Sequence, residues 1–416
     1  MDHAATTPMD PRVKKAMEPF WSDKFGNPNA IYKEGREART AVSKARAGIA
    51  KFIGARPEEI IFTSGGTESD NLAILGISGG AKQNFSRFAH LEARLPSGSR
   101  ASKLGIRPHI ITTKFEHPAV LEPCKFLEKN GFDVTYLNVG KEGVVDPEDV
   151  KKALRPETIL VSIIYANNEI GTIQPIKEIA KVIRDFKKGG SGKLTSFFPL
   201  FHSDACQAPG YLELDVNKLG VDFMTINGSK IYGPKGVGIL YAKKGIKLQP
   251  IMRGGEQERK IRPGTENVAA IVGLAEALKI AHKERAGEAK RLTTLRDYFI
   301  GRITTEIPKT FLNGHSTERL PNNINVSILD VEGESILLYL DEKGIACSTG
   351  SACTSEDLKP SHVIMALGRP YAYAHGALRF SLGKSNTKKD IDYVMNVLPR
   401  IVEKLKRISP VNVKVK

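Results

Sequence analysis

Short apolar runs alternate with amphipathic stretches along most of this chain, and this alternation constrains its fold more than any other feature. The apolar runs have the length of strands and are rich in Ile and Thr: residues 60–63, 109–113, 158–164 and 222–226. Such runs are typical of parallel strands that are buried on both faces. Between them, residues 119–129 and 176–187 have the period of helices. Strands that alternate with helices predict right-handed crossovers, and therefore an α/β fold with a mainly parallel sheet flanked by helices.

A second, smaller domain is expected after this sheet. The chain has 416 residues, which is more than one hydrophobic core usually organises. From residue 267 to about residue 302 the apolar positions keep a helical period, which predicts one long helix that links the two domains. The part that follows contains the expected strands 323–329 and 377–382 and a helix at 333–340. This pattern predicts a smaller α+β domain.

The composition is that of a basic enzyme of the cytoplasm. The formal net charge is +16, but the basic residues are spread along the chain, with no aromatic-interleaved patch. We therefore favour an enzyme that docks an acidic partner over a protein that binds nucleic acid. No apolar run approaches the ~20 residues of a membrane span, and the first residues lack a signal peptide's pattern. Four scattered cysteines indicate free thiols rather than a disulfide framework or a zinc site.

Lys230 and Asp204 each follow an apolar run and together suggest a cofactor. Lys230 stands between a predicted strand end and a glycine-rich turn that reaches Gly238, where a lysine can be desolvated and aimed at a carbonyl. Asp204 stands at the end of another apolar run. Pyridoxal phosphate (PLP) needs a lysine for its aldehyde and an acid for its pyridinium nitrogen. The pair makes PLP the leading hypothesis.

The turn at residues 63–71 is a candidate cradle for the phosphate of such a cofactor. It follows a predicted strand, contains two glycines, and opens an apolar helical run. Glycines allow the backbone to approach an anion, and a helix N-terminus supplies free N–H groups. Thr67 can add its hydroxyl. Many strand-to-helix turns have this composition for capping alone, so this motif gains weight only beside Lys230.

Two further polar motifs follow predicted strands. His117 comes directly before Pro118, so it can either stack on a flat heterocycle and move a proton, or simply cap a helix. The segment 167–171 (Asn-Asn-Glu-Ile-Gly) lies after the strand at 158–164, at the sheet edge where ligands of α/β proteins bind. An asparagine there can cap the next element or bind a ligand.

Cys353 is a candidate nucleophile. It is surrounded by Gly, Ser, Thr and Ala in a segment without apolar period, whereas a lone cysteine is more often a small core residue. This surrounding suits an exposed loop with a reactive thiolate. Cys347 lies closer to apolar residues, so we interpret it as structural.

These motifs together resemble the cysteine desulfurases of the IscS and NifS type, a branch of the class-V aminotransferases among the PLP enzymes of fold type I. The resemblance covers nearly the whole chain apart from residues 78–107 and 187–195. It is carried, in family order, by the motifs at residues 2–8, 25–28, 63–71, 116–117, 167–171, 230–238, 262–265, 350–353 and 379–383.

The resemblance implies a fold and an architecture. It implies a large PLP-binding domain at residues 14–285, built on a mainly parallel sheet of seven-stranded type. The small domain would comprise residues 1–13 and 286–416 and carry the cysteine loop at about 346–358. Residues 78–107, to which we assign no regular structure, look longer than the family's usual connection. The resemblance also implies a homodimer with shared active sites.

The resemblance also implies the role of each site residue. Lys230 would hold PLP covalently, Asp204 would pair with the pyridinium nitrogen, and Gln207 would face the ring oxygen. His117 would stack on the ring and move protons, and Cys353 would accept sulfur. The remaining implied contacts are to the phosphate (the Gly66 backbone, Thr67, Asn227 and Ser229), to the partner subunit's phosphate (Thr265) and to the substrate (Asn168 and Arg379), with Asn168 also beside the cofactor. Ser229 stands where the family commonly has histidine, and Asn227 where it commonly has serine.

The implied activity is conversion of L-cysteine to L-alanine with transfer of sulfur to Cys353 as a persulfide. The sulfur would pass to an acceptor or iron–sulfur scaffold protein, for cluster assembly or tRNA thiolation. No resident metal is implied, and Cys353 would contact an iron–sulfur cluster only transiently. Selenocysteine cleavage or another class-V reaction remains an alternative, although aminotransfer needs no thiol. A catalytically silent assembly scaffold is disfavoured because it has no need for Lys230, Asp204, His117, Cys353 and Arg379 together.

Overall fold

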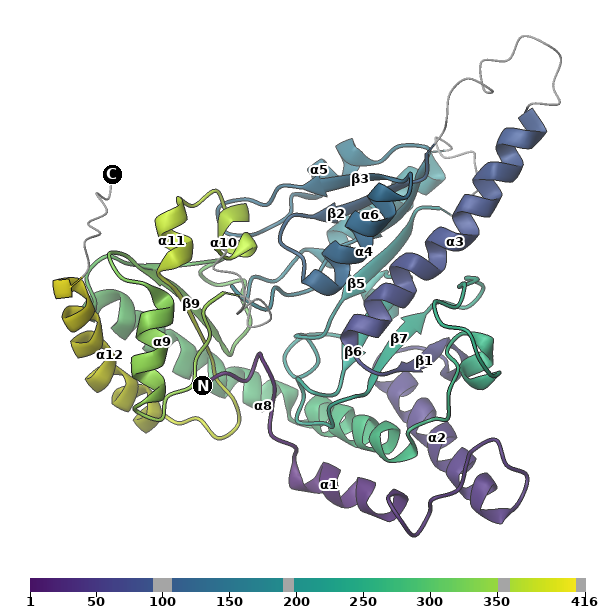
Figure 1. Ribbon diagram of the computed structural model, residues 1–416, viewed down its shortest axis with the longest axis horizontal. Coiled ribbons are helices and arrows are strands. Elements are labelled where there is room, and N and C mark those ends of the chain that lie inside the picture. Colours follow the sequence, from purple (N-terminus) through teal and green to yellow (C-terminus); the bar gives the residue numbers. More distant parts are fainter. Residues whose placement is uncertain (93–106, 190–197, 351–359, 409–416) are drawn as a thin grey trace.

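The computed structural model describes residues 1–92, 107–189, 198–350 and 360–408, with the backbone alone for residues 80–92. Helices cover both faces of a large sheet, and a second, smaller sheet with its own helices lies at the far end of a long helix (Figure 1). The helices are α1 Pro11–Met17, α2 Lys33–Phe52, α3 Gly66–Glu92, α4 Pro118–Lys129, α5 Pro147–Ala153, α6 Ile176–Lys188, α7 Val216–Leu219, α8 Val268–Glu306, α9 Gly333–Asp341, α10 His362–Ala366, α11 Tyr371–His375 and α12 Lys388–Ile408. No helix in these ranges is long and apolar enough to cross a membrane.

The large sheet has seven strands in the order β1-β7-β6-β5-β4-β2-β3. Strands β6, β5, β4, β2 and β3 pair in parallel, and β7 pairs antiparallel with both β1 and β6. The bounds are β1 Ile60–Thr63, β2 His109–Thr113, β3 Asp133–Leu137, β4 Thr158–Ser162, β5 Leu200–Asp204, β6 Phe223–Asn227 and β7 Gly238–Ala242. The predicted α/β fold with a mainly parallel, helix-flanked sheet is thereby confirmed.

One expected strand pairing was wrong. Residues 60–63 form the strand β1, but β1 pairs antiparallel with β7 rather than in parallel. The reason is the short connection between β6 and β7, since the chain turns back between Asn227 and Gly238 without the crossover that a parallel pair needs. The strand β7 therefore runs against β6 and separates β1 from it.

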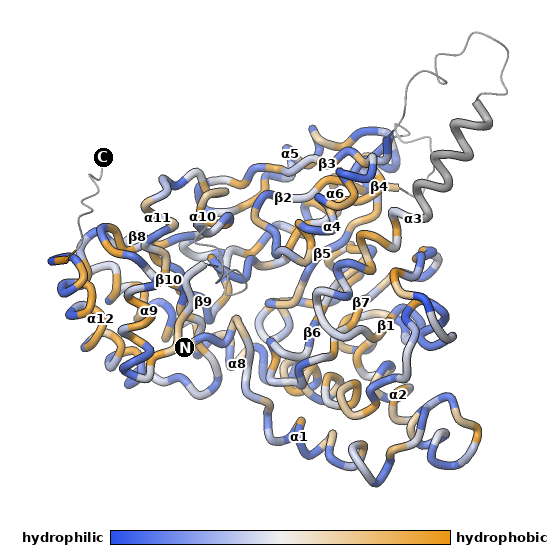
Figure 2. The backbone as a smooth tube through the Cα atoms, viewed as in Figure 1, coloured by the Kyte–Doolittle hydropathy of each residue, from blue (hydrophilic) through white to orange (hydrophobic). Residues whose placement is uncertain are grey.

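Alternate strand residues pack on opposite faces of the large sheet. Ile110 packs in the apolar cluster that contains residues of α3 and α4, and Ile111 packs in the cluster that contains residues of α2, α6 and α8. Both residues are fully buried. This alternation explains the continuous apolar runs of the sequence, because a strand covered on both faces needs no polar side. Hydrophobic segments accordingly follow the strands and the helices that cover them (Figure 2).

A second core surrounds the antiparallel three-stranded sheet β10-β9-β8. Its strands are β8 Thr310–Leu312, β9 Asn323–Ile328 and β10 Ala377–Ser381, and its apolar cluster draws on residues between Leu292 and Leu405. The long helix α8 contributes to both cores, as the helical period predicted. We propose that the two cores correspond to the expected domains, with 14–285 as the large one.

The helix α3 continues to Glu92, into the stretch for which the sequence suggested no regular structure. The sequence did not predict this part of the helix because it contains Gly79 and Gly80 followed by polar residues, and glycine is a weak helix former. Residues 93–106, most of the expected loop 187–195, and the end of the chain after Ile408 lie outside the described residues.

Candidate active site

Three of the predicted site residues lie at the carboxyl edge of the large sheet. Asp204 is the last residue of β5 and Asn227 the last residue of β6, while His117 lies between β2 and α4. Parallel strands bring their carboxyl ends to one edge, where α/β proteins bind ligands. Asp204 is buried, and its Oδ1 accepts a hydrogen bond of 2.9 Å from the backbone N–H of Cys206. One carboxylate oxygen is therefore fixed by the turn that follows the strand.

Lys230 lies in the turn after β6 and points to the N-terminal segment of the chain. Its Nζ donates a hydrogen bond of 2.5 Å to the carbonyl of Ala5. Gln207 donates from Nε2 to the carbonyl of Ala4 at 3.1 Å. The N-terminal segment therefore lies directly over the predicted lysine and glutamine.

The turn that holds Lys230 is clamped on both sides by Thr7. The backbone N–H and the hydroxyl of Thr7 donate to the Ser229 carbonyl at 2.9 Å and 3.0 Å, and the Tyr232 N–H donates to the same hydroxyl at 2.7 Å. Tyr232 has a φ of 60°, an uncommon conformation for a residue other than glycine that persists only where its surroundings hold it. These contacts fix the direction of the lysine side chain.

His117 caps the helix α4 through one of its ring nitrogens. Its Nδ1 accepts a hydrogen bond of 3.1 Å from the N–H of Ala119 at the start of α4, so a neutral ring carries its proton on Nε2. Burial lowers the pKa of His117, with the charge of Asp204 opposing and that of Lys230 adding to the effect. The capping alternative is thus realised at Nδ1, and Nε2 stays available for chemistry.

The N-terminus of α3 and the end of β6 lie side by side and offer hydrogen-bond donors for an anion. Gly66 is the first residue of α3, so its backbone N–H belongs to the turn that has no acceptor within the helix. A Cβ at Gly66 would lie 2.7 Å from the sulfur of Cys206 and 3.3 Å from Nδ2 of Asn227, so glycine is required here. Oδ1 of Asn227 is buried and without a hydrogen-bond partner within the described ranges. Of the other two residues predicted to bind the phosphate, Thr67 is exposed and Ser229 is half-buried.

Arg379 on β10 joins the small sheet to this edge. Its Nη1 donates to the backbone carbonyl of Asn168 at 3.0 Å, and its Nη2 donates to Asp2 Oδ1 at 2.8 Å and to Ser348 Oγ at 3.0 Å. The Arg379 side chain is only 3% exposed. The two residues predicted to hold substrate are therefore in contact, but Asn168 contributes its carbonyl. Asn167, by contrast, stabilises its own loop by accepting from the N–H groups of Glu169 and Ile170.

The predicted nucleophile Cys353 lies outside the described residues, although both flanks of its segment are described. Before it, the backbone N–H of Ser348 donates to the Arg379 carbonyl. After it, Ser361 Oγ donates to Glu169 Oε2 at 2.5 Å, and His362 Nε2 lies 2.9 Å from the carbonyl of Glu116. Both ends of the segment are thus attached beside the residues described above.

Two more residues considered in the sequence, Cys347 and Thr265, have other surroundings. Cys347 is buried in the core of the small sheet, and burial raises the pKa of its thiol to about 12, which agrees with a structural cysteine. Thr265 is exposed on the single chain, in the segment before α8.

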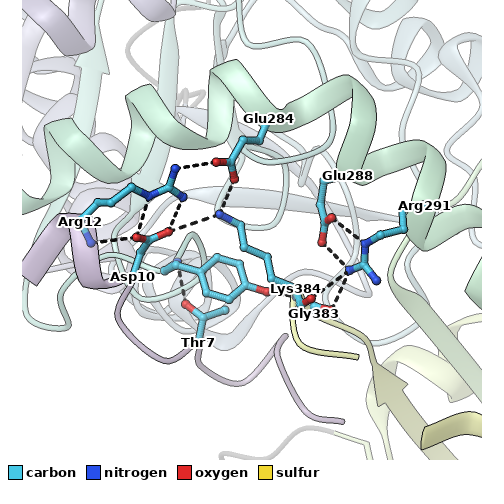
Figure 3. Close-up of polar contacts among 9 residues, drawn as sticks. Thr7, Asp10, Arg12, Glu284, Glu288, Arg291, Gly383 and Lys384 are labelled. Atoms are coloured by element: carbon cyan, nitrogen blue, oxygen red, sulfur yellow. Dashed lines mark hydrogen bonds and ion pairs between the residues drawn. The ribbon is translucent and has the colours of Figure 1, made fainter. Parts of the chain in front are cut away.

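Sequence reasoning assigned no role to a charged cluster that joins the N-terminal segment, α8 and the small sheet (Figure 3). Arg12 pairs with Asp10 at 2.7 Å and with Glu284 at 2.8 Å, and Lys384 pairs with Glu284 at 2.7 Å. Nearby, Arg291 donates to the carbonyl of Gly383 at 3.0 Å. Glu284 lies seven residues after the buried Ala277 on the long helix. The sequence does not indicate its partners, because Arg12 and Lys384 are distant in the chain and meet it only in the fold. The cluster connects the segment over Lys230 to the second core.

The fold and this group of side chains define a class of protein. A family model described as "Aminotransferase class-V" matches residues 1–86 and 95–394, and the chain belongs to that family. It is 52% identical to a "Cysteine desulfurase IscS" of Dictyoglomus turgidum over 99% of this chain and 96% of the relative. It is 47% identical to one of Methanosarcina thermophila over 100% of this chain and 94% of the relative. Within the class-V aminotransferases, the chain therefore belongs to the cysteine desulfurases of the IscS and NifS type.

Solved structures agree with this assignment. A structure described as "NIFS-LIKE PROTEIN" has a TM-score of 0.83 and 36% identity, covering 97% of this chain and 99% of the other. Another, "SspA in complex with cysteine", has a TM-score of 0.74 and 34% identity, covering 92% of this chain and 97% of the other. The predicted family and fold are confirmed, and the enzymes of this family depend on PLP.

Proposed function

We propose that this chain converts L-cysteine to L-alanine and transfers the sulfur to Cys353 as a persulfide. The observation that carries the proposal is the meeting of Lys230, Asp204 and His117 at one sheet edge, with Arg379 joining from the second core. Asp204 and Arg379 are buried and Lys230 is half-buried, and the pKa of His117 responds to the charges of both Asp204 and Lys230. Full-length similarity to a cysteine desulfurase of 52% identity supports the same reaction.

The residues present fit PLP. Lys230 would hold its aldehyde carbon, Asp204 its ring nitrogen, Gln207 its ring oxygen and His117 one ring face. The Gly66 backbone, Thr67, Asn227 and Ser229 would hold the phosphate, and Asn168 would lie beside the ring. The first turn of α3, which begins at Gly66, offers backbone N–H groups, and the side-chain amide of Asn227 lies beside it; these donors support this assignment. When bound, PLP supplies an electron sink for the substrate Cα.

Arg379 and Asn168 would bind the α-carboxylate end of L-cysteine. A guanidinium can grip a carboxylate through two parallel hydrogen bonds, and Arg379 already presents both of its Nη atoms to oxygen acceptors at this edge. Lys230, which would hold the cofactor's aldehyde carbon, would also be the base that moves the Cα proton of the substrate.

Cys353 would carry out the sulfur transfer. Its thiolate attacks the substrate sulfur, so that a sulfur–sulfur bond forms while the substrate carbon–sulfur bond breaks. The carbon receives a proton and leaves as L-alanine, and Cys353 is left as a persulfide. The described flanks of its segment are held at Ser348 and Ser361, and in this proposal the same sulfur meets substrate inside and an acceptor outside.

A homodimer with shared sites agrees with the exposed surface. Trp21, Phe25 and Ile31 are 55%, 72% and 84% exposed and stand within eleven residues of one another in the sequence, so this segment is our candidate for the interface. Thr265 would reach the phosphate in the partner subunit. The acceptor would be a sulfur carrier or iron–sulfur scaffold protein. The cytoplasmic location remains a prediction from the sequence.

The nucleophile is tested by mass spectrometry of the protein after exposure to L-cysteine. We expect a gain of one sulfur atom on the peptide that contains Cys353, its loss in Cys353→Ser, and its retention in Cys347→Ser. Reduction of the PLP-bound protein with borohydride should fix the cofactor to the Lys230 peptide. A persulfide that survives in Cys353→Ser would move the nucleophile elsewhere. Preference for selenocysteine is tested by comparing the two substrates.

A further inference from the structure

Behind Asp204 lies a buried acid–imidazole pair that the proposed reaction does not use. His202 stands two residues before Asp204 on β5, so both side chains project from the same face of the sheet. Asp70 on α3 approaches this face, and its Oδ1 lies 3.4 Å from His202 Nε2. The side chains of Asp70 and His202 are 1% and 0% exposed. Neither residue was identified from the sequence.

Hydroxyl groups from the neighbouring strands complete the surroundings of His202. Ser162 Oγ on β4 lies 2.8 Å from Nδ1, and Thr225 Oγ1 on β6 lies 3.2 Å from Nε2. Thr225 is also the cross-strand partner of Asp204 in the β5–β6 register. A displacement of His202 or Thr225 would therefore be transmitted directly to the position of Asp204.

The contacts of the pair allow one added proton to reside on Asp70. Asp70 Oδ1 is buried and lacks a hydrogen-bond partner among the residues described, and such an orphan group is costly. A proton on Asp70 would point at Nε2 of His202 and supply the missing bond. The imidazole would then carry its own proton on Nδ1 and donate it to Ser162. Asp70 Oδ1 and both ring nitrogens of His202 have partners in this arrangement, and the pair has no net charge.

The charges around the pair favour the same arrangement. Burial and the charge of Asp204 raise the pKa of Asp70 well above its ordinary value, against a hydrogen bond with Thr225 that lowers it. Burial lowers the pKa of His202 to about 4, although the charge of Asp204 opposes this shift. The other titratable groups that face this region are Glu116 and the thiol of Cys206, whose pKa values burial also raises. A second carboxylate charge at this place would repel the carboxylate of Asp204, which faces the pyridinium nitrogen in the proposed site.

We propose that Asp70 and His202 are positioning residues, which hold one proton as an uncharged pair and thereby fix Asp204, in its ionised form, toward the ring nitrogen of PLP. This inference rests on the proposed function, because it assigns Asp204 to the cofactor. It adds two residues that contact neither cofactor nor substrate.

The charge of the pair is tested by substitution at Asp70. Asp70→Asn preserves shape and can donate to His202 from its amide, so it imitates the protonated acid. Asp70→Ala removes the donor and leaves Nε2 with Thr225 as its remaining partner among the residues named above. We expect the dissociation constant of PLP, measured by titration of apo-protein, to stay within about threefold in Asp70→Asn and to rise about tenfold or more in Asp70→Ala. The pH midpoint of the visible band of bound PLP should shift only in Asp70→Ala.

A control and a direct readout separate this role from a general loss of stability. Asp222 lies beside the opposite end of β6 and pairs with Lys187 and Lys243, so Asp222→Asn should lower stability without moving the pH midpoint. The infrared difference spectrum of wild type minus Asp70→Asn should contain the C=O stretch of a protonated carboxylic acid. This readout requires no activity and no Asp70→Ala protein.

The possible failures are distinguishable. If Asp70→Asn shifts the midpoint as much as Asp70→Ala does, or if the acid band is missing, Asp70 is ionised and the inference is wrong. An Asp70→Ala protein that binds PLP as tightly as wild type, with the same midpoint, would also overturn it. Wild-type protein that takes up no PLP would overturn the proposed function, and this inference with it.

Discussion

Arg379 and Asp2 form an ion pair in which Nη2 and Oδ1 are 2.8 Å apart. The pair closes the N-terminal segment onto β10, where Asp2 also forms an isolated bridge with Ser381. Arg379 is therefore already bound to a carboxylate at the position proposed for the carboxylate of the substrate. Substrate and Asp2 compete for one guanidinium, which makes Asp2 a determinant of affinity.

We predict that Asp2→Asn lowers the KM for L-cysteine by about threefold to tenfold. The amide oxygen keeps a hydrogen bond to Arg379, but the competing charge is removed, and charge-assisted hydrogen bonds are roughly twice as strong as neutral ones. Steady-state kinetics with varied L-cysteine measure the effect. An increase in KM would show instead that Asp2 mainly holds Arg379 in place.

Arg379→Lys should raise the KM for L-cysteine roughly tenfold to a hundredfold. Lysine keeps the positive charge but cannot form the fork of two parallel hydrogen bonds, each worth about 1.5–3 kcal/mol to a charged group. The absorbance of bound PLP should be unchanged, because Arg379 is assigned to the substrate. Loss of the PLP band at unchanged KM would contradict that assignment.

Glu116 should make the protein less stable as the pH rises from about 5 to 8. Burial raises the pKa of Glu116 to about 8, so between its ordinary pKa and 8 the unfolded chain loses a proton that the folded protein keeps. The stabilisation is thus full below the ordinary pKa and is lost as pH rises through 8, by up to about 1.4 kcal/mol per pH unit.

Glu116→Gln isolates this contribution because glutamine does not titrate. The urea midpoint of the variant, relative to wild type, should be higher at pH 8 than at pH 5. A difference that stays constant across this range would mean that Glu116 titrates alike in the folded and unfolded states.

Arg291→Met should lower the thermal midpoint by several degrees. Arg291 donates to the carbonyls of Asn386 and Gly383 at 2.7 Å and 3.0 Å and pairs with Glu288, so its loss leaves partly buried acceptors unpaired at a cost of about 1–3 kcal/mol. Lys388→Met is the matched control. The side chain of Lys388 is 62% exposed and pairs with Asp392, and exposed ion pairs of this kind contribute about 0–1 kcal/mol to stability. Equal shifts for both variants would contradict a structural role for Arg291.

The strand-and-helix order of the large sheet and the residues at its strand ends could be predicted from local pattern. Asp204, His117 and Lys230 each stand at the end of an apolar run or in the turn after one. The alternation of apolar runs and helical stretches therefore places them at strand ends. The antiparallel pairing of β1 could not be predicted, because a strand's own composition does not specify its neighbour. Asp2 and Asp70 were missed for a related reason, since their partners Arg379 and His202 are distant in the sequence and meet only in the folded chain.

The most direct test of the central claim is to quantify L-alanine and sulfide together after incubating the PLP-loaded protein with L-cysteine and a thiol reductant. The account predicts equal amounts of the two products in wild type and in Cys347→Ser, and neither product above background in Cys353→Ser. Pyruvate in place of alanine, or sulfide formation that is undiminished in Cys353→Ser, would contradict it.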